Sequence, residues 1–201
     1  MTGQPGDPGP PTDASRERSA QAPASLGETT LRSPRLVLEP LTAAHADALF
    51  EGMRDPSLYP FIPQEPPASV EALRTRYRRL EARVSPDGRE QWLNWAVRHG
   101  EAHVGLVEVT VTGDKASLAY FVLATWQRRG IAREACAAVL TELWRRTPVP
   151  FVEATVDDRN EASLGLLASL GFVEERRVTG ADFFKGRSSD EVVLRLPRPP
   201  G

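Results

Sequence analysis

The chain has 201 residues, of which 40% are hydrophobic and 26% charged, so its length and composition fit one globular domain with a substantial core. Its formal net charge of −2 comes without a dense block of lysine and arginine, which disfavours a nucleic-acid-binding surface. No apolar stretch reaches the roughly 18 residues of a membrane span, and the N-terminus has no secretory signal. The single cysteine cannot form an internal disulfide, so we expect a cytoplasmic protein.

The chain divides into three parts by composition. Residues 1–32 are rich in proline, glycine and serine, and their first large apolar residue is Leu26, so we expect a disordered tail. The folded domain should span residues 33–197 and be followed by a short tail, residues 198–201. A partner-binding role for the N-terminal tail is an alternative, although the tail contains no recognisable ligand motif.

The first half of the domain begins with an alternating pattern that predicts a strand over residues 35–40. Thr42 is the expected N-cap of a helix that ends before Asp55. Five prolines within residues 56–67 predict an extended loop. Ser69 then caps a second predicted helix, whose apolar residues recur at three-to-four spacing.

In the second half, the hydrophobic period changes to that of strands. Three consecutive strands are predicted over residues 92–98, 104–112 and 117–123. They are followed by a helix after Gly130, a strand over 151–156, a helix over 160–170 and strands over 172–178 and 190–196. This order predicts an α/β fold with a mixed sheet.

The most informative segment is Gln127–Ala132 (QRRGIA), which lies between an apolar strand and an amphipathic helix. The first turn of a helix carries unpaired N–H groups and the positive end of the dipole, and it therefore binds phosphate. Gly130 would let the backbone approach such an anion closely. The segment is similar to the (Gln/Arg)-x-x-Gly-x-(Gly/Ala) motif of the GNAT N-acetyltransferases, which implies that the anion is the pyrophosphate of coenzyme A (CoA).

The order of the elements also resembles the GNAT fold, over about residues 33–196. This implies an α/β domain whose central mixed, mostly antiparallel sheet of six to seven strands is flanked by about four helices. The proline-rich loop is similar to that of the ribosomal-protein-alanine N-acetyltransferases. The implied reaction moves an acetyl group from acetyl-CoA to a primary amine by direct attack in a ternary complex. The implied acceptor is a peptide or protein N-terminus or a small-molecule amine, and we expect a monomer or a homodimer.

The resemblance assigns CoA to two motifs. The turn would hold the pyrophosphate, and the strand before it would pair with the pantetheine arm and help to stabilise the developing oxyanion. The second motif is an Asn-x-x-Ser that opens the helix after residue 159, where capping is the alternative role. The residues implied to contact CoA are Phe121, Val122, Leu123, Gln127, Arg128, Arg129, Gly130, Ile131, Ala132, Arg133, Asn160 and Ser163.

The acid and base of the reaction are less clearly marked in the sequence. In many relatives a glutamate lies near the start of the strand that precedes the turn, where this chain has Ala116-Ser117. Glu108 and Glu153 are the remaining candidates for the base, although each is also consistent with a solvent-facing strand residue. Ser163 or Tyr120 would return a proton to the sulfur, with core packing as the alternative role of Tyr120.

Two further observations limit the alternatives. His45, His99 and His103 show no metal-ligand spacing, so we expect exposed histidines and no metal site, and Cys136 should be a packed small residue. Because the family glutamate is missing, a non-catalytic domain that senses acyl-CoA is the main alternative to an enzyme. The other is an interaction protein that acts through its proline-rich tail.

Overall fold

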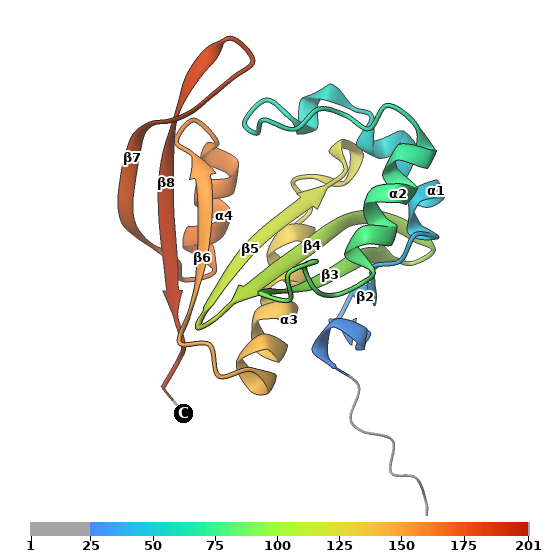
Figure 1. Cartoon of the computed structure of the whole chain (residues 1–201), viewed down its shortest axis with the longest axis horizontal. Coiled ribbons are helices and arrows are strands. Elements are labelled where there is room, and N and C mark those ends of the chain that lie inside the picture. Colours follow the sequence, from blue (N-terminus) through green and yellow to red (C-terminus); the bar gives the residue numbers. More distant parts are fainter. Residues whose placement is uncertain (1–24, 201) are drawn as a thin grey trace, which may run out of the picture.

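The computed structural model describes residues 25–200 and contains every helix and strand predicted above (Figure 1). The strands are β1 (Leu31–Arg32), β2 (Leu36–Pro40), β3 (Glu90–His99), β4 (Ala102–Thr112), β5 (Lys115–Val122), β6 (Phe151–Asp157), β7 (Val173–Phe184) and β8 (Arg187–Pro197). The helices are α1 (His45–Met53), α2 (Val70–Leu80), α3 (Ile131–Arg146) and α4 (Glu161–Ser169). Short 3₁₀ turns are η1 (Leu26–Glu28), η2 (Pro56–Leu58) and η3 (Ala124–Trp126).

Within residues 25–200 the strands form one eight-stranded sheet in the order β1-β2-β3-β4-β5-β6-β8-β7. Every neighbouring pair is antiparallel except β5 and β6, which are parallel. The predicted mixed, mostly antiparallel sheet is confirmed, but the expected six to seven strands were too few. No helix in this part of the chain is long and apolar enough to cross a membrane.

The sheet lies between two layers of helices, and alternation along its central strands explains why. Trp95 and Val107 point into the core beneath α3 and α4, whereas their chain neighbours Ala96 and Leu106 point into the core beneath α1 and α2. All four side chains are at most 1% exposed. Since successive strand residues face opposite sides, one apolar stretch supplies both cores. Figure 1 shows α3 and the α1–α2 pair on opposite faces of the sheet.

The domain begins earlier than the predicted boundary at residue 33. Leu26 in η1 and Leu31 in β1 are only 8% and 4% exposed, and β1 pairs with β2. Residues 26–32 therefore belong to the domain. The sequence did not indicate this because a strand of two residues is too short to give a periodic signal. Residues 1–24 of the predicted tail lie outside the described part of the chain. At the other end, Arg198 donates hydrogen bonds to backbone carbonyls of the domain rather than extending as a tail.

Capping of the first two helices differs from expectation in one case. The predicted cap Thr42 lies too early: the N-cap of α1 is Ala44, which makes no side-chain cap bond. The Thr42 backbone N–H instead donates to Nδ1 of His45 (3.0 Å). Ser69 caps α2 as predicted, because its Oγ accepts a hydrogen bond from the Ala72 N–H (3.1 Å).

The closing hairpin is longer than the predicted strands 172–178 and 190–196. β7 and β8 continue to a two-residue turn at Lys185 and Gly186, both of which have positive φ, as a tight hairpin turn requires. The register shifts between Val178 and Asp182, and almost the whole of β7 is exposed. Without one buried face the strand has no alternating apolar pattern, so its outer half was not predicted.

The arrangement that positions the site is the separation of β5 from β6. These strands pair over only three residues, Lys115 to Ser117 against Phe151 to Glu153. Beyond this point they diverge, as the yellow and orange strands of Figure 1 show. The remaining length of β5 therefore has no strand partner on its β6 side.

β4 approaches β5 so closely at Gly105 that a side chain does not fit. A Cβ placed there would lie 2.1 Å from the Phe121 carbonyl oxygen. Gly105→Ala should therefore lower the free energy of unfolding by about 1–3 kcal/mol, the usual cost of overpacking. Urea denaturation measures this loss. The matched control is Gly165→Ala in α4, where a Cβ meets nothing within 4 Å and helix propensity should make the change neutral or stabilising. Equal midpoints for Gly105→Ala and the parent protein would contradict the steric argument.

Candidate active site

The segment Gln127–Ala132 forms the turn that leads from η3 into α3. Gly130 is the N-cap of α3 and has φ +75°, in the left-handed region that glycine tolerates. The helical hydrogen bonds begin with the Glu134 N–H donating to the Gly130 carbonyl (3.0 Å). The N–H groups of residues 131–133 therefore precede the helical ladder and are available to an outside acceptor. With the dipole of a 16-residue helix behind it, this turn has the geometry of an anion site.

The turn is held in place by Arg35 and Glu134, which were not identified from the sequence. Arg35 donates from Nη1 to the Arg129 carbonyl (3.1 Å) and from Nε to Oε2 of Glu134 (2.7 Å). Ser33 Oγ and the Arg35 N–H donate to the other oxygen of Glu134. Burial alone would raise the pKa of Glu134, but these hydrogen bonds outweigh it and lower the pKa. Because Arg35 and Glu134 are 99 residues apart, no local motif indicates the pair.

Along β5, the backbone groups that face the gap can be identified from one hydrogen bond. The Leu123 N–H donates to the Val104 carbonyl (2.9 Å), so it faces β4 and is not available as an oxyanion donor. Strand groups alternate in direction, and the N–H and carbonyl of Val122 therefore face the gap. Gln127 Nε2 donates to this Val122 carbonyl (3.1 Å). As the strand donor to the oxyanion, the geometry therefore favours Val122 over Leu123.

On the α3 and α4 face, the structure brings Tyr120 and the second motif together. Asn160 caps α4, because its Oδ1 accepts a hydrogen bond from the Ser163 N–H (3.1 Å). The Tyr120 hydroxyl lies 2.6 Å from Oγ of Ser163. Burial raises the pKa of Tyr120 to about 12 against the opposing effect of this hydrogen bond, so the phenol stays protonated at neutral pH. The pair can hold and donate a proton beside the gap.

On the α2 face, a cavity of about 430 Å³ contains both carboxylate candidates. Its lining includes Arg76, Trp92, Glu108, Ser117, Glu153 and Thr155. The cavity lies where β5 and β6 begin to diverge. An acceptor in it would therefore face a group that enters through the gap from the other side of the sheet.

Glu108 is not the solvent-facing residue that alternation allowed. It shares the face of β4 that bears Leu106 and packs beneath α2, and its side chain is 18% exposed. Burial raises its pKa, while the Arg76 guanidinium at 3.6 Å acts in the opposite direction. A carboxylate whose pKa lies above the usual range is a stronger base than an exposed one.

Glu153 is less suitable as a base. It accepts a hydrogen bond from Arg195 Nη2 (2.9 Å) and pairs with Lys115 Nζ (3.2 Å). The hydrogen bond from Arg195, followed by the Lys115 interaction, lowers its pKa despite partial burial. Two cations thus keep this carboxylate ionised and engage both of its oxygens. Of the two glutamates, the geometry favours Glu108 as the base.

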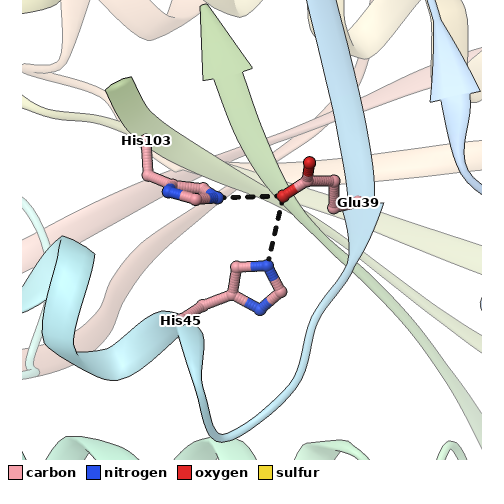
Figure 2. A group of neighbouring side chains, drawn as sticks. All are labelled: Glu39, His45 and His103. Carbon is pink, nitrogen blue, oxygen red and sulfur yellow. Dashed lines mark hydrogen bonds and ion pairs between the residues drawn. The ribbon is translucent and has the colours of Figure 1, made fainter. Parts of the chain in front are cut away.

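The histidines are neither scattered nor fully exposed. His45 and His103 both contact Glu39, and their side chains are 12% and 18% exposed (Figure 2). His99 packs against Trp126 with ring centroids 5.3 Å apart. The prediction of exposed histidines was wrong because the β2–β3–β4 pairing joins residues that are far apart in the chain. Cys136 is fully buried, as predicted, and burial raises the pKa of its thiol.

Sequence comparison identifies the domain. A family model described as an acetyltransferase (GNAT) domain matches residues 35–173. The chain belongs to the GNAT acetyltransferases. No curated protein matches the sequence.

Solved structures share this GNAT fold along most of their length. A protein of T. thermophilus described as an acetyltransferase is 26% identical, with a TM-score of 0.71 over 84% of this chain and 89% of that one. Mycobacterium smegmatis RimJ, solved with CoA-disulfide, is 22% identical (TM-score 0.72, 84% and 86% covered). RimL, a ribosomal L7/L12 α-N-protein acetyltransferase solved with CoA, is 17% identical (TM-score 0.76, 84% and 98% covered).

In this GNAT domain the proline-rich loop is fastened by the tip of the β7–β8 hairpin. Lys185 Nζ donates to the carbonyls of Tyr59 (2.6 Å), Ile62 (2.8 Å) and Gln64 (3.0 Å). Figure 1 shows the hairpin tip reaching toward this loop. The contact spans more than 120 residues of sequence, so it could not be read from a local pattern.

Lys185→Met should release the loop without unfolding the domain. Hydrogen bonds from a charged donor contribute about 1.5–3 kcal/mol each, so amide exchange in residues 56–67 should accelerate at least about tenfold. Hydrogen–deuterium exchange with mass spectrometry measures this change. Arg187→Met, on the same hairpin and exposed, is the matched control and should leave exchange in the loop unaltered. Equal exchange in the two variants would show that the Lys185 contacts do not hold the loop.

Proposed function

We propose that this protein transfers the acetyl group of acetyl-CoA to a primary amine by direct attack in a ternary complex. The observation that carries the proposal is the gap between β5 and β6, which connects two different environments. On one face lie the α3 turn and the Tyr120–Ser163 pair, and on the other lies the cavity with Glu108. A thioester placed in the gap is accessible to a proton donor on one side and to an amine and its base on the other.

CoA binding would use the backbone more than side chains. The N–H groups from Arg129 to Arg133 would hold the pyrophosphate, and the exposed side chains of Arg128, Arg129 and Arg133 would add positive charge. The pantetheine arm would follow the unpaired edge of β5, where the Val122 carbonyl already accepts a hydrogen bond from Gln127 Nε2 and has a second lone pair to offer. The amide nitrogen of Asn160 would be its partner on α4, since only Oδ1 is used by the cap.

The reaction would proceed without a covalent enzyme intermediate. The amine nitrogen attacks the thioester carbonyl carbon, Glu108 removes a proton from that nitrogen, directly or through water, and the carbon–sulfur bond breaks. Tyr120 donates its proton to the departing sulfur and is reprotonated from solvent, while Ser163 orients the phenol. Positioning of the two reactants supplies much of the rate, and the Val122 N–H stabilises the oxyanion.

The acceptor cavity is basic at its rim. Arg76 and Arg79 project from α2, and the Arg79 guanidinium lies over the Trp92 ring, 6.0 Å from its centroid. Cations at this position favour an amine that carries an anionic group nearby. We favour the α-amine of a peptide whose following residues are acidic, in keeping with the N-terminal acetylation named for RimL. Small amines bearing a carboxylate or phosphate are the second class.

Thiol release from acetyl-CoA tests the proposal, measured with peptides of varied N-terminal sequence and with small amines. Acetylated product together with free CoA, and preference for acidic peptides over matched basic ones, would support it. A thermal shift with acetyl-CoA, CoA and ATP runs in parallel. The sensor alternative, suggested by Ala116-Ser117 at the family's glutamate position, predicts stabilisation by acetyl-CoA without release on any amine. Absence of stabilisation by either CoA compound would overturn the assignment of the α3 turn.

A further inference from the structure

Glu39, His45 and His103 form a cluster that the acetyltransferase reaction does not use. Glu39 comes from β2, His45 from the first residue of α1, and His103 from the start of β4. One carboxylate oxygen, Oε2 of Glu39, lies 2.9 Å from Nε2 of His103 and 3.4 Å from Nε2 of His45. Figure 2 shows one nitrogen of each imidazole ring pointing at this oxygen. None of the three residues lines the cavity that contains Glu108.

The spacing of these atoms matches a shared metal ion. The three ligand atoms lie within 4.8 Å of one another. In a tetrahedral zinc site with metal–ligand bonds of about 2.0–2.1 Å, neighbouring ligand atoms are about 3.3 Å apart. The observed separations of 2.9 and 3.4 Å differ from that value by less than half an ångström. The third separation, between the imidazole nitrogens, is at most 4.8 Å, and side-chain rotations would have to bring all three atoms around one ion.

We propose that Glu39, His45 and His103 bind a Zn²⁺ ion, with water at the fourth position. Two imidazole nitrogens and one carboxylate oxygen are a ligand set that zinc accepts. The side chains are 12–27% exposed, which leaves a path for the ion and room for the water. Because the ligands join β2, α1 and β4, the ion would stabilise the domain rather than take part in acetyl transfer.

In the metal-free cluster Nε2 of His45 is poorly satisfied, which favours this assignment. Two N–H donors share one oxygen, and the His45 contact of 3.4 Å is at the limit of a hydrogen bond. Nδ1 of His45 lies 3.0 Å from the Thr42 Oγ1 and 3.3 Å from the Thr42 carbonyl. A metal on Nε2 would require a proton on Nδ1, which would donate to a Thr42 oxygen in place of the bond that Nδ1 now accepts from the Thr42 N–H. Such outer partners fix the tautomer of metal-binding histidines.

The carboxylate is already oriented for binding. Arg98 Nε donates to Oε1 of Glu39 (2.7 Å), which turns Oε2 toward the histidines. The positive charge of Arg98 also weakens the carboxylate as a ligand, so we expect lower affinity than in a site of three neutral histidines.

The composition of the chain leaves few other side chains that zinc would prefer. It contains three histidines and one cysteine, and the cysteine is buried. Full-length protein with any affinity tag removed would be stripped with EDTA, desalted, and titrated with Zn²⁺ by calorimetry and with Co²⁺ by visible absorption. We expect one ion per chain, a four-coordinate Co²⁺ spectrum and a melting temperature that rises with Zn²⁺.

Variants separate the cluster from other sites. Loss of an outer-shell partner typically weakens metal binding about 10–100-fold, so removing a ligand with His103→Gln, His45→Gln or Glu39→Gln should weaken it at least as much. His99→Gln is the matched control and should bind Zn²⁺ as the parent protein does. If a ligand variant does not fold, long-range ¹H–¹⁵N spectra of the parent protein still decide, because Zn²⁺ should shift the Nε2 signals of His45 and His103 but not of His99. No binding, binding that survives the ligand variants, or a shift only at His99 would overturn the proposal.

Discussion

Gly130→Asp should bind CoA and acetyl-CoA at least about tenfold more weakly than Gly130→Asn, although the two variants differ by one charge. Both substituted residues must adopt the backbone φ of +75° found at Gly130, and aspartate and asparagine tolerate that region better than most residue types. Only aspartate places a negative charge beside the N–H groups of residues 131–133. One like charge about 4 Å from a phosphate costs about 1 kcal/mol in water and more near a protein surface, and a tenfold change in affinity corresponds to about 1.4 kcal/mol.

Calorimetric titration with CoA measures the affinities of the parent protein and both variants. A third variant, Gly113→Asp, adds the same charge at another glycine of positive φ, in the β4–β5 hairpin at the other end of β5 from the turn, and should bind CoA like the parent protein. Thermal unfolding without ligand checks that the two substitutions at Gly130 strain the backbone equally. If aspartate and asparagine bind CoA alike, the phosphates do not lie at the α3 turn, and the proposed cofactor site is wrong.

The parts of the site that sequence could predict are those with a local physical cause. Gly130 stands between an apolar strand and an amphipathic helix, and a helix N-terminus with free N–H groups follows from that order. Capping, the alternative role that the sequence offered for Asn160, is observed for the same reason, because Asn followed by a helix is a local signal. The fold was equally accessible, since the hydrophobic period changes at each boundary between helix and strand.

The remaining features depend on tertiary contacts. Glu134 looks like an ordinary first-turn acid until the β1–β2 connection brings Arg35 and Ser33 to it. Lys185 looks like a solvated hairpin residue, yet it holds three carbonyls of the proline-rich loop. Glu39 and His103 are 64 residues apart, and only the pairing of β2, β3 and β4 joins them. No period or spacing within one segment contains this information.

Glu108 illustrates the same limit, because alternation assigned its face without showing what covers that face. The pattern of β4 places Glu108 opposite Val107 and Val109, which is typical of a charge that points to solvent. In the structure α2 covers that side, and the carboxyl group is left with Arg76 as its nearest cation. A largely buried acid whose ion-pair partner lies 3.6 Å away costs stability, and proteins retain such groups where they have a function.

Glu108→Gln should therefore lower activity and raise stability together. Loss of the base should reduce kcat/KM about 10²–10⁴-fold. The raised pKa of Glu108 means that the folded state holds this proton more tightly than the unfolded state, whose pKa is near 4.5. The parent protein therefore loses stability as pH rises above 4.5 toward the folded pKa, and the full loss persists above it. Glutamine does not ionise, so the melting temperature of the variant should exceed that of the parent by a margin that grows with pH up to the folded pKa of Glu108 and is constant above it.

Glu153→Gln is the matched control, because it makes the same change in the same cavity with the opposite electrostatics. Arg195 and Lys115 lower the pKa of Glu153, so its stabilising effect is complete above the ordinary value of 4.5 and fades as pH falls through the lowered value. The glutamine variant should therefore melt below the parent protein at neutral pH, with a smaller loss of kcat/KM than Glu108→Gln. Differential scanning fluorimetry between pH 5 and 9, with initial rates in the same buffers, measures both effects. If the two variants lose activity equally, or if Glu108→Gln is the less stable one, Glu108 is a structural partner of Arg76, and the amine loses its proton to another group.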